Sequence, residues 1–241
     1  MTSWADTLSG ATAIVTGASR GIGLAVSAAL AGAGARVAMV ARGAGALREA
    51  ALSAGGEPVP ADVTTEEGVA RVVAACTRLF GTDAPDVVVN CAGAFELAPV
   101  AETSVASFDR QMAVNVRAPF LLIRAFLPAM LRRGEGHVVT IGSIAGRHAF
   151  PHNGAYSASK FAVRGLHAVL QAEIRGTGVR ATLVEPAATD SPLWDAIDFD
   201  RHPGLPGRES MLSPATVADA VLYVLTRPPE AAVPNLMIER S

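Results

Sequence analysis

Short apolar runs alternate with longer helical patterns along the whole chain, and this alternation constrains the fold more than any other feature. The short runs are mostly continuous in apolar residues, as in strands of a parallel sheet that helices cover on both faces. We expect strands at Thr12–Val15, Arg36–Ala41, Val59–Val63, Asp86–Asn90, His137–Ile141, Arg180–Glu185 and Leu236–Ile238. Helical length and apolar spacing predict helices at Ile22–Ala33, Ala46–Ala54, Glu66–Phe80, Ser107–Arg132, Tyr156–Gly176 and Thr216–Thr226.

Strands and helices in this order predict right-handed crossovers, and so a Rossmann-like, doubly wound parallel sheet of about seven strands with helices on both faces. The length of 241 residues suits one α/β domain, which we place at residues 1–241. Half of the residues are apolar, so a sizeable core can form without disulfides or metals.

Composition argues against several classes of function. The formal net charge of −2 gives no reason to expect nucleic acid or an anionic membrane as a partner. The two cysteines, Cys76 and Cys91, form neither a disulfide framework nor a metal site, and Cys91 is interpreted as a small core residue. Residues 1–10 carry no basic cluster and no apolar run typical of export signals, so we expect a soluble, cytoplasmic protein without a metal.

The stretch Pro186–Leu212 is the one long irregular segment, and it is rich in Pro, Gly and Asp. Segments of this length within a compact domain are usually functional or disordered. This one follows a strand directly, at the edge where α/β sheets bind ligands, which favours a loop that covers the substrate over a disordered insertion.

A glycine-rich turn follows the first predicted strand and opens the first helix. The spacing in Thr16–Gly23 is G-x-x-x-G-x-G rather than the general G-x-G-x-x-G. Glycines there let backbone N–H groups approach a pyrophosphate at the helix N-terminus. Any tight turn after a strand can use glycine, but the position after the first strand favours a dinucleotide. The residues expected to hold the cofactor here are Gly17, Ser19, Arg20, Gly21, Ile22 and Gly23.

The end of the second strand indicates which dinucleotide is bound. An acidic residue at this point would accept the ribose 2′-OH of NAD and repel the 2′-phosphate of NADP. The chain has Ala41 followed by Arg42, with Arg20 available from the glycine turn. Two guanidinium groups suit a phosphate dianion, so NADP(H) is favoured over NAD, although solvated arginines are common in so Arg-rich a chain.

Tyr156 and Lys160 stand one helical turn apart and so share a face of their helix. Lys160 is the only lysine in the sequence. One lysine placed at random would follow either of the two tyrosines by four residues about one time in a hundred. A nearby ammonium stabilises a phenolate, so we expect Lys160 to lower the pKa of Tyr156 towards the working range of an acid/base catalyst.

Ser143 ends the fifth predicted strand, at the same edge of the sheet. Its hydroxyl is placed to hydrogen-bond a substrate carbonyl oxygen, although a serine in a turn is more often structural. His148 and His152, which lie between Ser143 and Tyr156, are interpreted as loop residues near the pocket rather than catalytic bases, because Tyr156 fills that role.

The order of these motifs along the chain closely resembles the short-chain dehydrogenase/reductase family. The motifs are Thr16-Gly-x-x-x-Gly-Ile-Gly23, Asn90-Cys91-Ala92-Gly93, Asn115, Ser143 and Tyr156-Ser-Ala-Ser-Lys160, and they cover nearly the whole chain. The resemblance implies an oxidoreductase that transfers hydride between NADP(H) and a carbonyl/alcohol pair. It assigns proton transfer to Tyr156 and carbonyl orientation to Ser143.

The same resemblance implies further roles. Lys160 would hold the nicotinamide ribose and lower the pKa of Tyr156, and Asn115 would complete a water-linked proton relay through Lys160. Asp62 and Val63 would flank the adenine. Further cofactor-binding residues implied by the resemblance are Asn90, Ala92, Gly93, Pro186 and Thr189.

Two departures from the family pattern stand out. Cys91 replaces the second asparagine of Asn-Asn-Ala-Gly, and Ala187 replaces the glycine that usually follows Pro186. The second change leaves open whether Thr189 or Ser191 meets the carboxamide of the nicotinamide.

Alternative functions on this fold are a nucleotide-binding protein without turnover, an NAD-dependent alcohol dehydrogenase, and a lyase or epimerase. The set of Asn115, Ser143, Tyr156 and Lys160 favours an enzyme, because a protein that only binds nucleotide needs none of them together. A lyase or epimerase usually adds an acidic residue near the tyrosine, and residues 152–155 contain none.

The expected partners are a small-molecule substrate and further copies of the chain. Candidate pocket residues are mostly apolar, which suggests a small apolar or aromatic carbonyl compound; they are Phe95, Leu97, Ile144, His148, Phe150, Leu193, Trp194 and Ile197. The helices Ser107–Arg132 and Tyr156–Gly176 carry much small and apolar surface, and in the family such helices pair across a two-fold. We therefore expect a homodimer or homotetramer.

Overall fold

The computed structural model describes residues 6–202, 204–228 and 230–241, and a seven-stranded sheet runs through them in the order β3-β2-β1-β4-β5-β6-β7. Every neighbouring pair of strands is parallel. The strands are β1 (Thr12–Thr16), β2 (Arg36–Ala41), β3 (Glu57–Pro60), β4 (Val87–Asn90), β5 (Gly136–Ile141), β6 (Val179–Pro186) and β7 (Asn235–Ile238). The predicted doubly wound sheet is confirmed.

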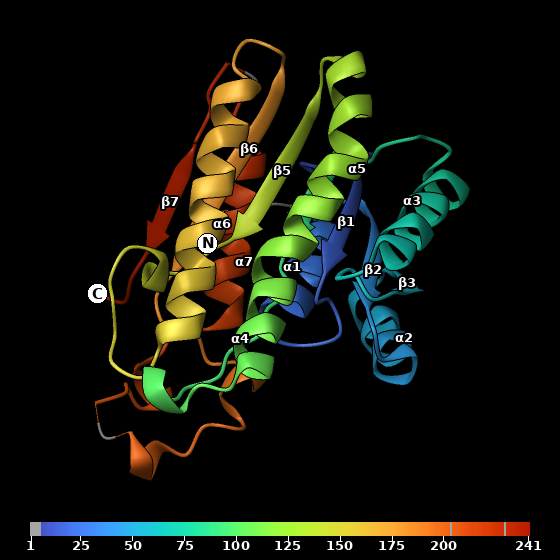
Figure 1. Cartoon of the computed structure of the whole chain (residues 1–241). Helices are drawn as coiled ribbons and strands as arrows, with labels where there is room; N and C mark the ends of the chain where they lie inside the picture. Colours follow the sequence, from blue (N-terminus) through green and yellow to red (C-terminus); the bar gives the residue numbers. More distant parts are fainter. Residues whose placement is uncertain (1–5, 203, 229) are drawn as a thin grey trace.

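Helices cover both faces of this sheet. They are α1 (Gly21–Gly32), α2 (Ala44–Ala54), α3 (Glu66–Phe80), α4 (Val105–Met112), α5 (Ala118–Arg133), α6 (Gly154–Glu173) and α7 (Pro214–Leu225). In Figure 1, α5 and α6 cross the near face of the sheet, and α1 and α7 lie behind it.

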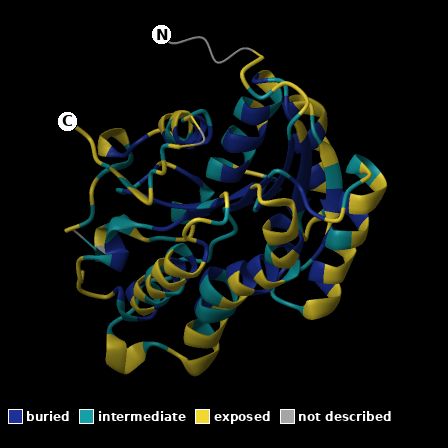
Figure 2. Ribbon diagram, turned by 90° about the horizontal axis from the view of Figure 1, so that it is seen from above, coloured by how far each residue is buried: buried dark blue, intermediate teal, exposed yellow. Residues whose placement is uncertain are grey.

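The sheet separates two apolar cores. Ala13 and Val15 of β1 pack with side chains of α1, α2 and α7, whereas Ile14 between them packs with those of α3, α5 and α6. Both faces of the central strands are therefore buried, which explains the continuous apolar runs in the sequence. Figure 2 shows the same arrangement, with buried residues along the strands and exposed residues on the outer sides of the helices.

Two elements differ from the sequence prediction. The strand expected at Val59–Val63 is β3 at Glu57–Pro60, because β3 is an edge strand that tolerates Pro58 and Pro60. The chain then turns at Asp62, whose side chain accepts hydrogen bonds from the backbone N and the hydroxyl of Thr64.

The second difference lies in the helix expected at Ser107–Arg132. The helical run starts at Val105, after Ser104 caps it by accepting a hydrogen bond from the backbone N of Ser107. A π-helical segment, Ala113–Arg117, separates α4 from α5. Such segments occur frequently at functional sites.

The helical run Val105–Arg133 is long and apolar enough to cross a membrane, but half of its most apolar stretch is buried inside the protein. Core helices of soluble proteins meet the same test. This observation therefore gives only weak evidence for a membrane.

The order of the strands places the candidate site. The order reverses between β1 and β4, and α/β proteins bind ligands outside the carboxyl ends of the strands at such a point. Three predicted features follow β1, β4 and β5 at this edge: the glycine turn, the segment Asn90–Gly93, and Ser143.

The segment Pro186–Leu212 follows β6 at the same edge. It contains the 3-10 turns η4 (Pro192–Trp194), η5 (Phe199–Arg201) and η6 (Arg208–Ser210). A β-bridge joins Thr189 to Leu212 and so closes the segment at its base. Arg208 forms ion pairs with Asp190 and Asp195. These ion pairs hold the described residues of the segment together.

Candidate active site

The glycine turn packs against the segment that follows β4. Gly17 has φ +66°, and a Cβ there would lie 2.8 Å from the Cα of Ala92. The hydroxyl of Thr16 accepts hydrogen bonds from the backbone N of Cys91 (3.0 Å) and of Ala92 (3.1 Å). Thr16 thus joins the two loops that border the cleft. The sequence analysis gave Thr16 no role, although its place directly before Gly17 was a signal.

The N-terminus of α1 opens directly from this turn. A Cβ on Gly23 would lie 2.4 Å from the carbonyl oxygen of Gly17, so only glycine fits there. Gly21 has φ +57°, and a Cβ there would lie 3.2 Å from the Cβ of Ser191. The segment Pro186–Leu212 therefore reaches across the cleft to the glycine turn.

Charged side chains lie at the outer end of the cleft. Arg20 precedes α1 and Arg42 follows β2, and both are exposed. Burial raises the pKa of Asp62, but hydrogen bonds from Thr64 and the charge of Arg42 outweigh it, so this pKa lies below its ordinary value. The structure thus places Arg42 near enough to Asp62 for its charge to act on that carboxylate.

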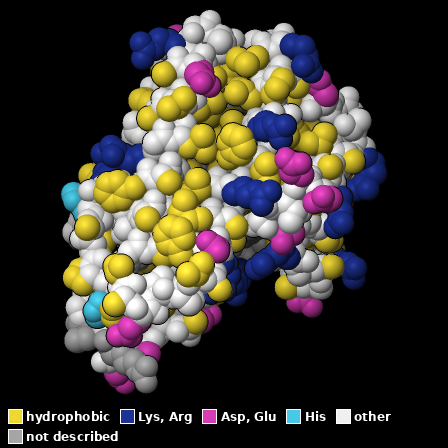
Figure 3. Space-filling view, viewed as in Figure 1, with side chains coloured by type: hydrophobic (Ala, Val, Ile, Leu, Met, Phe, Trp, Pro, Cys, Tyr) yellow, Lys and Arg dark blue, Asp and Glu magenta, His cyan; other side chains and the backbone are white. Residues whose placement is uncertain are grey.

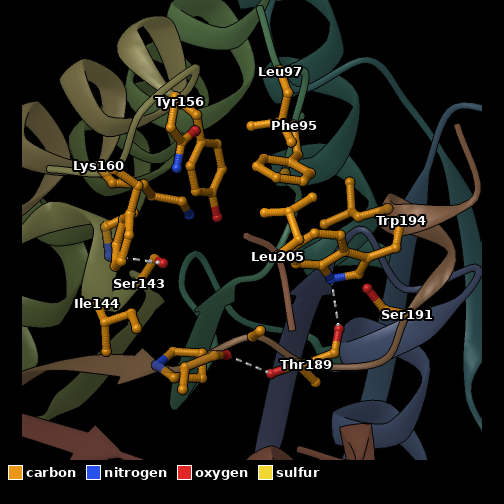
Figure 4. Close-up of a pocket in the computed structure, with 18 of the residues that line it drawn as sticks. Phe95, Leu97, Ser143, Ile144, Tyr156, Lys160, Thr189, Ser191, Trp194 and Leu205 are labelled. Carbon is orange, nitrogen blue, oxygen red and sulfur yellow. Dashed lines mark hydrogen bonds between the residues drawn. The ribbon is translucent and has the colours of Figure 1, made fainter. Parts of the chain in front are cut away.

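Tyr156, Ser143 and Lys160 converge on one cavity at the inner end of the cleft. Figure 4 shows the hydroxyl of Tyr156 and the end of the Lys160 side chain directed towards the part of the cavity that Ser143 lines. Tyr156 and Lys160 come from the first two turns of α6, and Ser143 follows β5. The hydroxyl of Ser143 accepts a hydrogen bond of 3.1 Å from the backbone N of Ala145.

Burial determines the protonation state of the tyrosine. It raises the pKa of Tyr156 to about 12, although a hydrogen bond with Ser143 acts in the opposite direction. This pKa is therefore raised and not lowered as expected, and Ser143 rather than Lys160 is the group that opposes the effect of burial. At neutral pH Tyr156 retains its proton.

Lys160 is buried in the wall of the cavity. Its Nζ donates a hydrogen bond of 3.0 Å to the carbonyl oxygen of Ile141 and lies 5.5 Å from the centre of the Tyr156 ring. Burial lowers the pKa of Lys160 to about 8, and the neighbouring Cys91 partly opposes this. Burial also raises the pKa of Cys91 to about 12, so the thiol is neutral at neutral pH.

Asn115 lies in the π-helical segment and is 2% exposed. Its Nδ2 donates hydrogen bonds of 2.9 Å to the carbonyl oxygen of Ala94 and to the hydroxyl of Ser159. Its Oδ1 accepts one from the backbone N of Ala94. Asn115 thus ties the chain after β4 to α6, and none of these bonds reaches Lys160.

A buried ion pair supports the turn that carries Ser143, and the sequence analysis missed it. Glu185 of β6 is fully buried, and Arg147 donates two hydrogen bonds to its Oε2, of 2.8 and 2.5 Å. Arg164 of α6 lies 3.6 Å from its Oε1. The available signal was a charged residue at the end of an apolar strand, because a carboxylate there needs a partner.

The cavity has a volume of about 390 Å³. Six of the eight predicted pocket residues line it: Phe95, Leu97, Ile144, Phe150, Leu193 and Trp194. His148 and Ile197 are not among the lining residues, so those two predictions are wrong. His152, Asn153, His202 and Leu205 line the cavity in addition.

Residues assigned to the nicotinamide end of a cofactor lie around the same cavity. Gly93, Pro186, Thr189 and Ser191 line it. Thr189 donates its hydroxyl proton to the carbonyl oxygen of Ala187 at 3.0 Å. Both hydroxyls are near enough to the cavity that the choice between Thr189 and Ser191 stays open. Asn90 lies deeper, and its Nδ2 donates to the hydroxyl of Thr140.

The described part of the chain contains no cluster of three or more His, Cys, Asp or Glu side chains that could hold a metal ion. The phenol of Tyr156, the hydroxyl of Ser143 and the ammonium of Lys160 line the cavity. Such groups can move a proton to or from an oxygen atom.

Comparison with known proteins identifies the family. Residues 11–201 match the family model described as short chain dehydrogenase. The chain belongs to this family. The short-chain dehydrogenases are oxidoreductases that bind a nicotinamide cofactor and act on small molecules.

Two curated relatives illustrate the match. The chain is 40% identical over 96% of its length to a glycine betaine reductase of Emericella nidulans, but it spans only about a fifth (19%) of that protein. It is 32% identical to an uncharacterized oxidoreductase of Staphylococcus haemolyticus, and the match covers 96% of this chain and 97% of that protein.

Two solved structures share the fold over nearly the whole chain. A metagenomic short-chain oxidoreductase in complex with NADP has a TM-score of 0.82 and 31% identity, with 98% of this chain and 99% of that chain covered. An alcohol dehydrogenase of Thermococcus sibiricus, complexed with 5-hydroxy-NADP, has a TM-score of 0.80 and 30% identity, with 95% of each chain covered.

Proposed function

We propose that this short-chain dehydrogenase transfers hydride between NADP(H) and a carbonyl/secondary alcohol pair on a small substrate, with Tyr156 as general acid/base. The observation that carries the proposal is the convergence of Tyr156, Ser143 and Lys160 on one cavity beside the glycine turn. Burial raises the pKa of Tyr156 to about 12, so its phenol is protonated at neutral pH, as a general acid requires.

The residues present fit a dinucleotide. The contact of Gly17 with Ala92 leaves a narrow cradle of backbone N–H groups at the start of α1, where a pyrophosphate binds well. Arg20 and Arg42 would hold the 2′-phosphate, and Asp62 with Val63 would flank the adenine. The remaining residues proposed to hold the cofactor are Gly17, Ser19, Gly21, Ile22, Gly23, Asn90, Ala92, Gly93, Tyr156, Lys160, Pro186 and Thr189.

NADP is favoured over NAD by charge. Ala41 at the end of β2 gives no repulsion to a phosphate, and Arg42 beside it is exposed. The NADP complex of one solved relative and the 5-hydroxy-NADP complex of another support the same choice.

The chain's own groups supply the proton chemistry. When bound, the cofactor supplies or accepts the hydride at the substrate carbon. In the reducing direction Ser143 donates a hydrogen bond to the carbonyl oxygen, and Tyr156 transfers its proton to that oxygen as negative charge develops. Lys160 would bind the nicotinamide ribose and return a proton to the tyrosinate, fed by a water-linked relay through Asn115.

The substrate is proposed to bind among Phe95, Phe150 and Trp194, with its carbonyl at Ser143. The name of the glycine betaine reductase relative adds a quaternary ammonium compound as a candidate substrate. A Ser-Tyr-Lys site handles a carbonyl/alcohol pair, so the aldehyde/alcohol step is the part of such chemistry that suits this chain.

We also propose a homodimer or homotetramer in the cytoplasm, with neither a membrane nor nucleic acid as partner. Support for assembly comes from apolar side chains that are 40–55% exposed on α5 and α6, namely Phe120, Leu131, Phe161 and Val169. Figure 3 shows hydrophobic side chains gathered over these two helices. Support for the cytoplasm comes from two cysteines that are both free thiols.

The test is NADPH oxidation against a panel of ketones and aldehydes, with Tyr156→Phe as the diagnostic variant. This substitution removes one hydroxyl and leaves the ring in place, so folding and NADPH binding should survive. Turnover should fall on the order of 10²–10⁴-fold. A variant that binds NADPH normally and turns over near the wild-type rate would remove Tyr156 from the reaction. Binding of NADPH without turnover of any compound would favour a nucleotide-binding protein.

A further inference from the structure

Three aromatic side chains form a corner of the cavity. The ring of Phe95 lies 4.8 Å from that of Tyr156 at an interplanar angle of 73°, and 4.8 Å from that of Trp194 at 62°. All three residues line the cavity, and Figure 4 shows them around one space. Rings at steep angles present π faces in different directions, as in sites that surround a cation.

The indole of Trp194 is fixed so that it offers little but its π surface. Its Nε1 donates a hydrogen bond of 3.1 Å to the carbonyl oxygen of Thr189, so this N–H is already used. Phe199, which is not among the lining residues, stacks on Trp194 at 5.9 Å and 27°. The corner is therefore held in place by contacts within the segment Pro186–Leu212.

The charges around the corner decide which cation fits. None of the described residues that line the cavity is Asp or Glu, so an ammonium with N–H groups would lose its hydration without gaining a carboxylate. A quaternary ammonium has no N–H to satisfy, and its methyl groups pack on aromatic faces. Lys160 is the one lysine or arginine among the described residues that line the cavity. Its Nζ donates to the carbonyl oxygen of Ile141 and lies over the Tyr156 ring at 5.5 Å, so Phe95 and Trp194 are the aromatic side chains left for a substrate cation.

We infer that Phe95 and Trp194 in this corner bind the trimethylammonium end of a short aldehyde whose carbonyl lies at Ser143 and Tyr156. This inference rests on the proposed function and names its substrate class. NADPH and one proton from solvent balance the reaction: hydride would add to the aldehyde carbon, the proton of Tyr156 would go to the oxygen, and solvent would return a proton to Tyr156. The products are a trimethylammonium alcohol and NADP⁺.

The test compares two aldehydes of nearly the same shape. One is trimethylammonio-acetaldehyde, and the other carries a tert-butyl group in place of the trimethylammonium group. The two groups have nearly the same size, but the ammonium also makes the carbonyl more electrophilic. Recognition of the cation is therefore measured by how far substitutions in the corner change the ratio of the two kcat/KM values. We expect the cation to be favoured on the order of tenfold, as a desolvated cation–π contact allows.

Variants assign the preference to the corner. Trp194→Leu and Phe95→Leu should each reduce the ratio severalfold while the neutral aldehyde is still reduced, which also shows that the variants fold. Phe80→Leu is the matched control, because Phe80 ends α3 and contacts Arg36 rather than the cavity. It should leave the ratio unchanged.

The outcomes separate the two proposals. Equal kcat/KM values, a preference for the neutral aldehyde, or turnover of other aldehydes with neither of these two overturns the inference and leaves the proposed function standing. A cation preference that survives both leucine variants also overturns it. Absence of turnover with every carbonyl compound is the failure of the proposed function itself.

Discussion

Replacing Lys160 with methionine should make the protein more stable and much less active. Burial lowers the pKa of Lys160 from its ordinary value of 10.5 to about 8, so the folded protein holds the charged form at a cost. The difference between the two pKa values corresponds to about 3 kcal/mol below pH 8. Methionine fills a similar volume without this cost but loses the hydrogen bond to Ile141, about 1 kcal/mol.

The net gain is therefore about 2 kcal/mol, and for a chain of this size it corresponds to a rise in Tm of about 4–8 °C. Activity should fall at least about a hundredfold, because a positioned cationic group is removed from the site. Gain of stability with loss of activity is expected where a charge is buried for function.

The pH dependence of stability distinguishes the cost of burying the charge of Lys160 from a change in side-chain packing. Between about pH 8 and 10.5 the unfolded chain binds a proton at Lys160 that the folded chain has released. The stability of the wild type therefore gains from this group as pH rises through that range, whereas the variant has no such gain. The advantage of the variant should be largest below pH 8. Above pH 10.5 only the lost hydrogen bond remains, so the wild type should then be more stable by about 1 kcal/mol.

The assay is thermal unfolding of the wild type, Lys160→Met and a control, Arg175→Met, across this pH range. Arg175 follows α6 and is exposed, so its loss should change stability by less than about 0.5 kcal/mol at any pH. A Lys160→Met variant that is less stable than the wild type at neutral pH, or a difference that does not shrink as pH rises, would refute the burial cost.

Three further predictions concern cofactor, packing and assembly. NADPH should give a far higher kcat/KM than NADH, and Ala41→Asp should reverse or abolish this preference by repelling the 2′-phosphate; a wild type that prefers NADH contradicts the assignment of Arg42. Arg147→Met should lower the free energy of unfolding by about 3 kcal/mol in denaturant titrations, because Glu185 is left buried beside only the more distant Arg164; an unchanged value would show that the pair contributes nothing. Sedimentation should show a dimer or tetramer at micromolar concentration, and monomer alone would exclude the assembly proposed from α5 and α6.

Most strands and helices could be predicted from the sequence, because each apolar run is long enough to identify its element without knowledge of its neighbours. β1, β2 and β5 lie within one or two residues of their predicted bounds, since each is a buried strand with both faces covered. β3 was displaced because an edge strand tolerates proline and needs few apolar residues. The π-helical segment Ala113–Arg117 leaves no mark in apolar spacing, so the sequence predicted an uninterrupted helix.

The site was predictable where it depends on local spacing. Tyr156 and Lys160 share a face of α6 because they are four residues apart, and Ser143 meets them because β5 ends beside α6. Protonation was not predictable, because the pKa of Tyr156 depends on how deeply the ring is buried. Two other contacts were not predictable, because each joins residues far apart in the sequence. They are the ion pair of Arg147 with Glu185 and the contact of Trp194 with Phe95.

Transfer of deuterium from the cofactor to the product tests the central claim most directly. NADPH carrying deuterium at both C4 positions of the nicotinamide is incubated with the enzyme and the best carbonyl substrate, and the alcohol is analysed by mass spectrometry. Direct hydride transfer predicts one deuterium bound to the carbinol carbon, at a rate that Tyr156→Phe reduces on the order of 10²–10⁴-fold. An alcohol without deuterium, or label transfer at the same rate in the phenylalanine variant, would contradict the account.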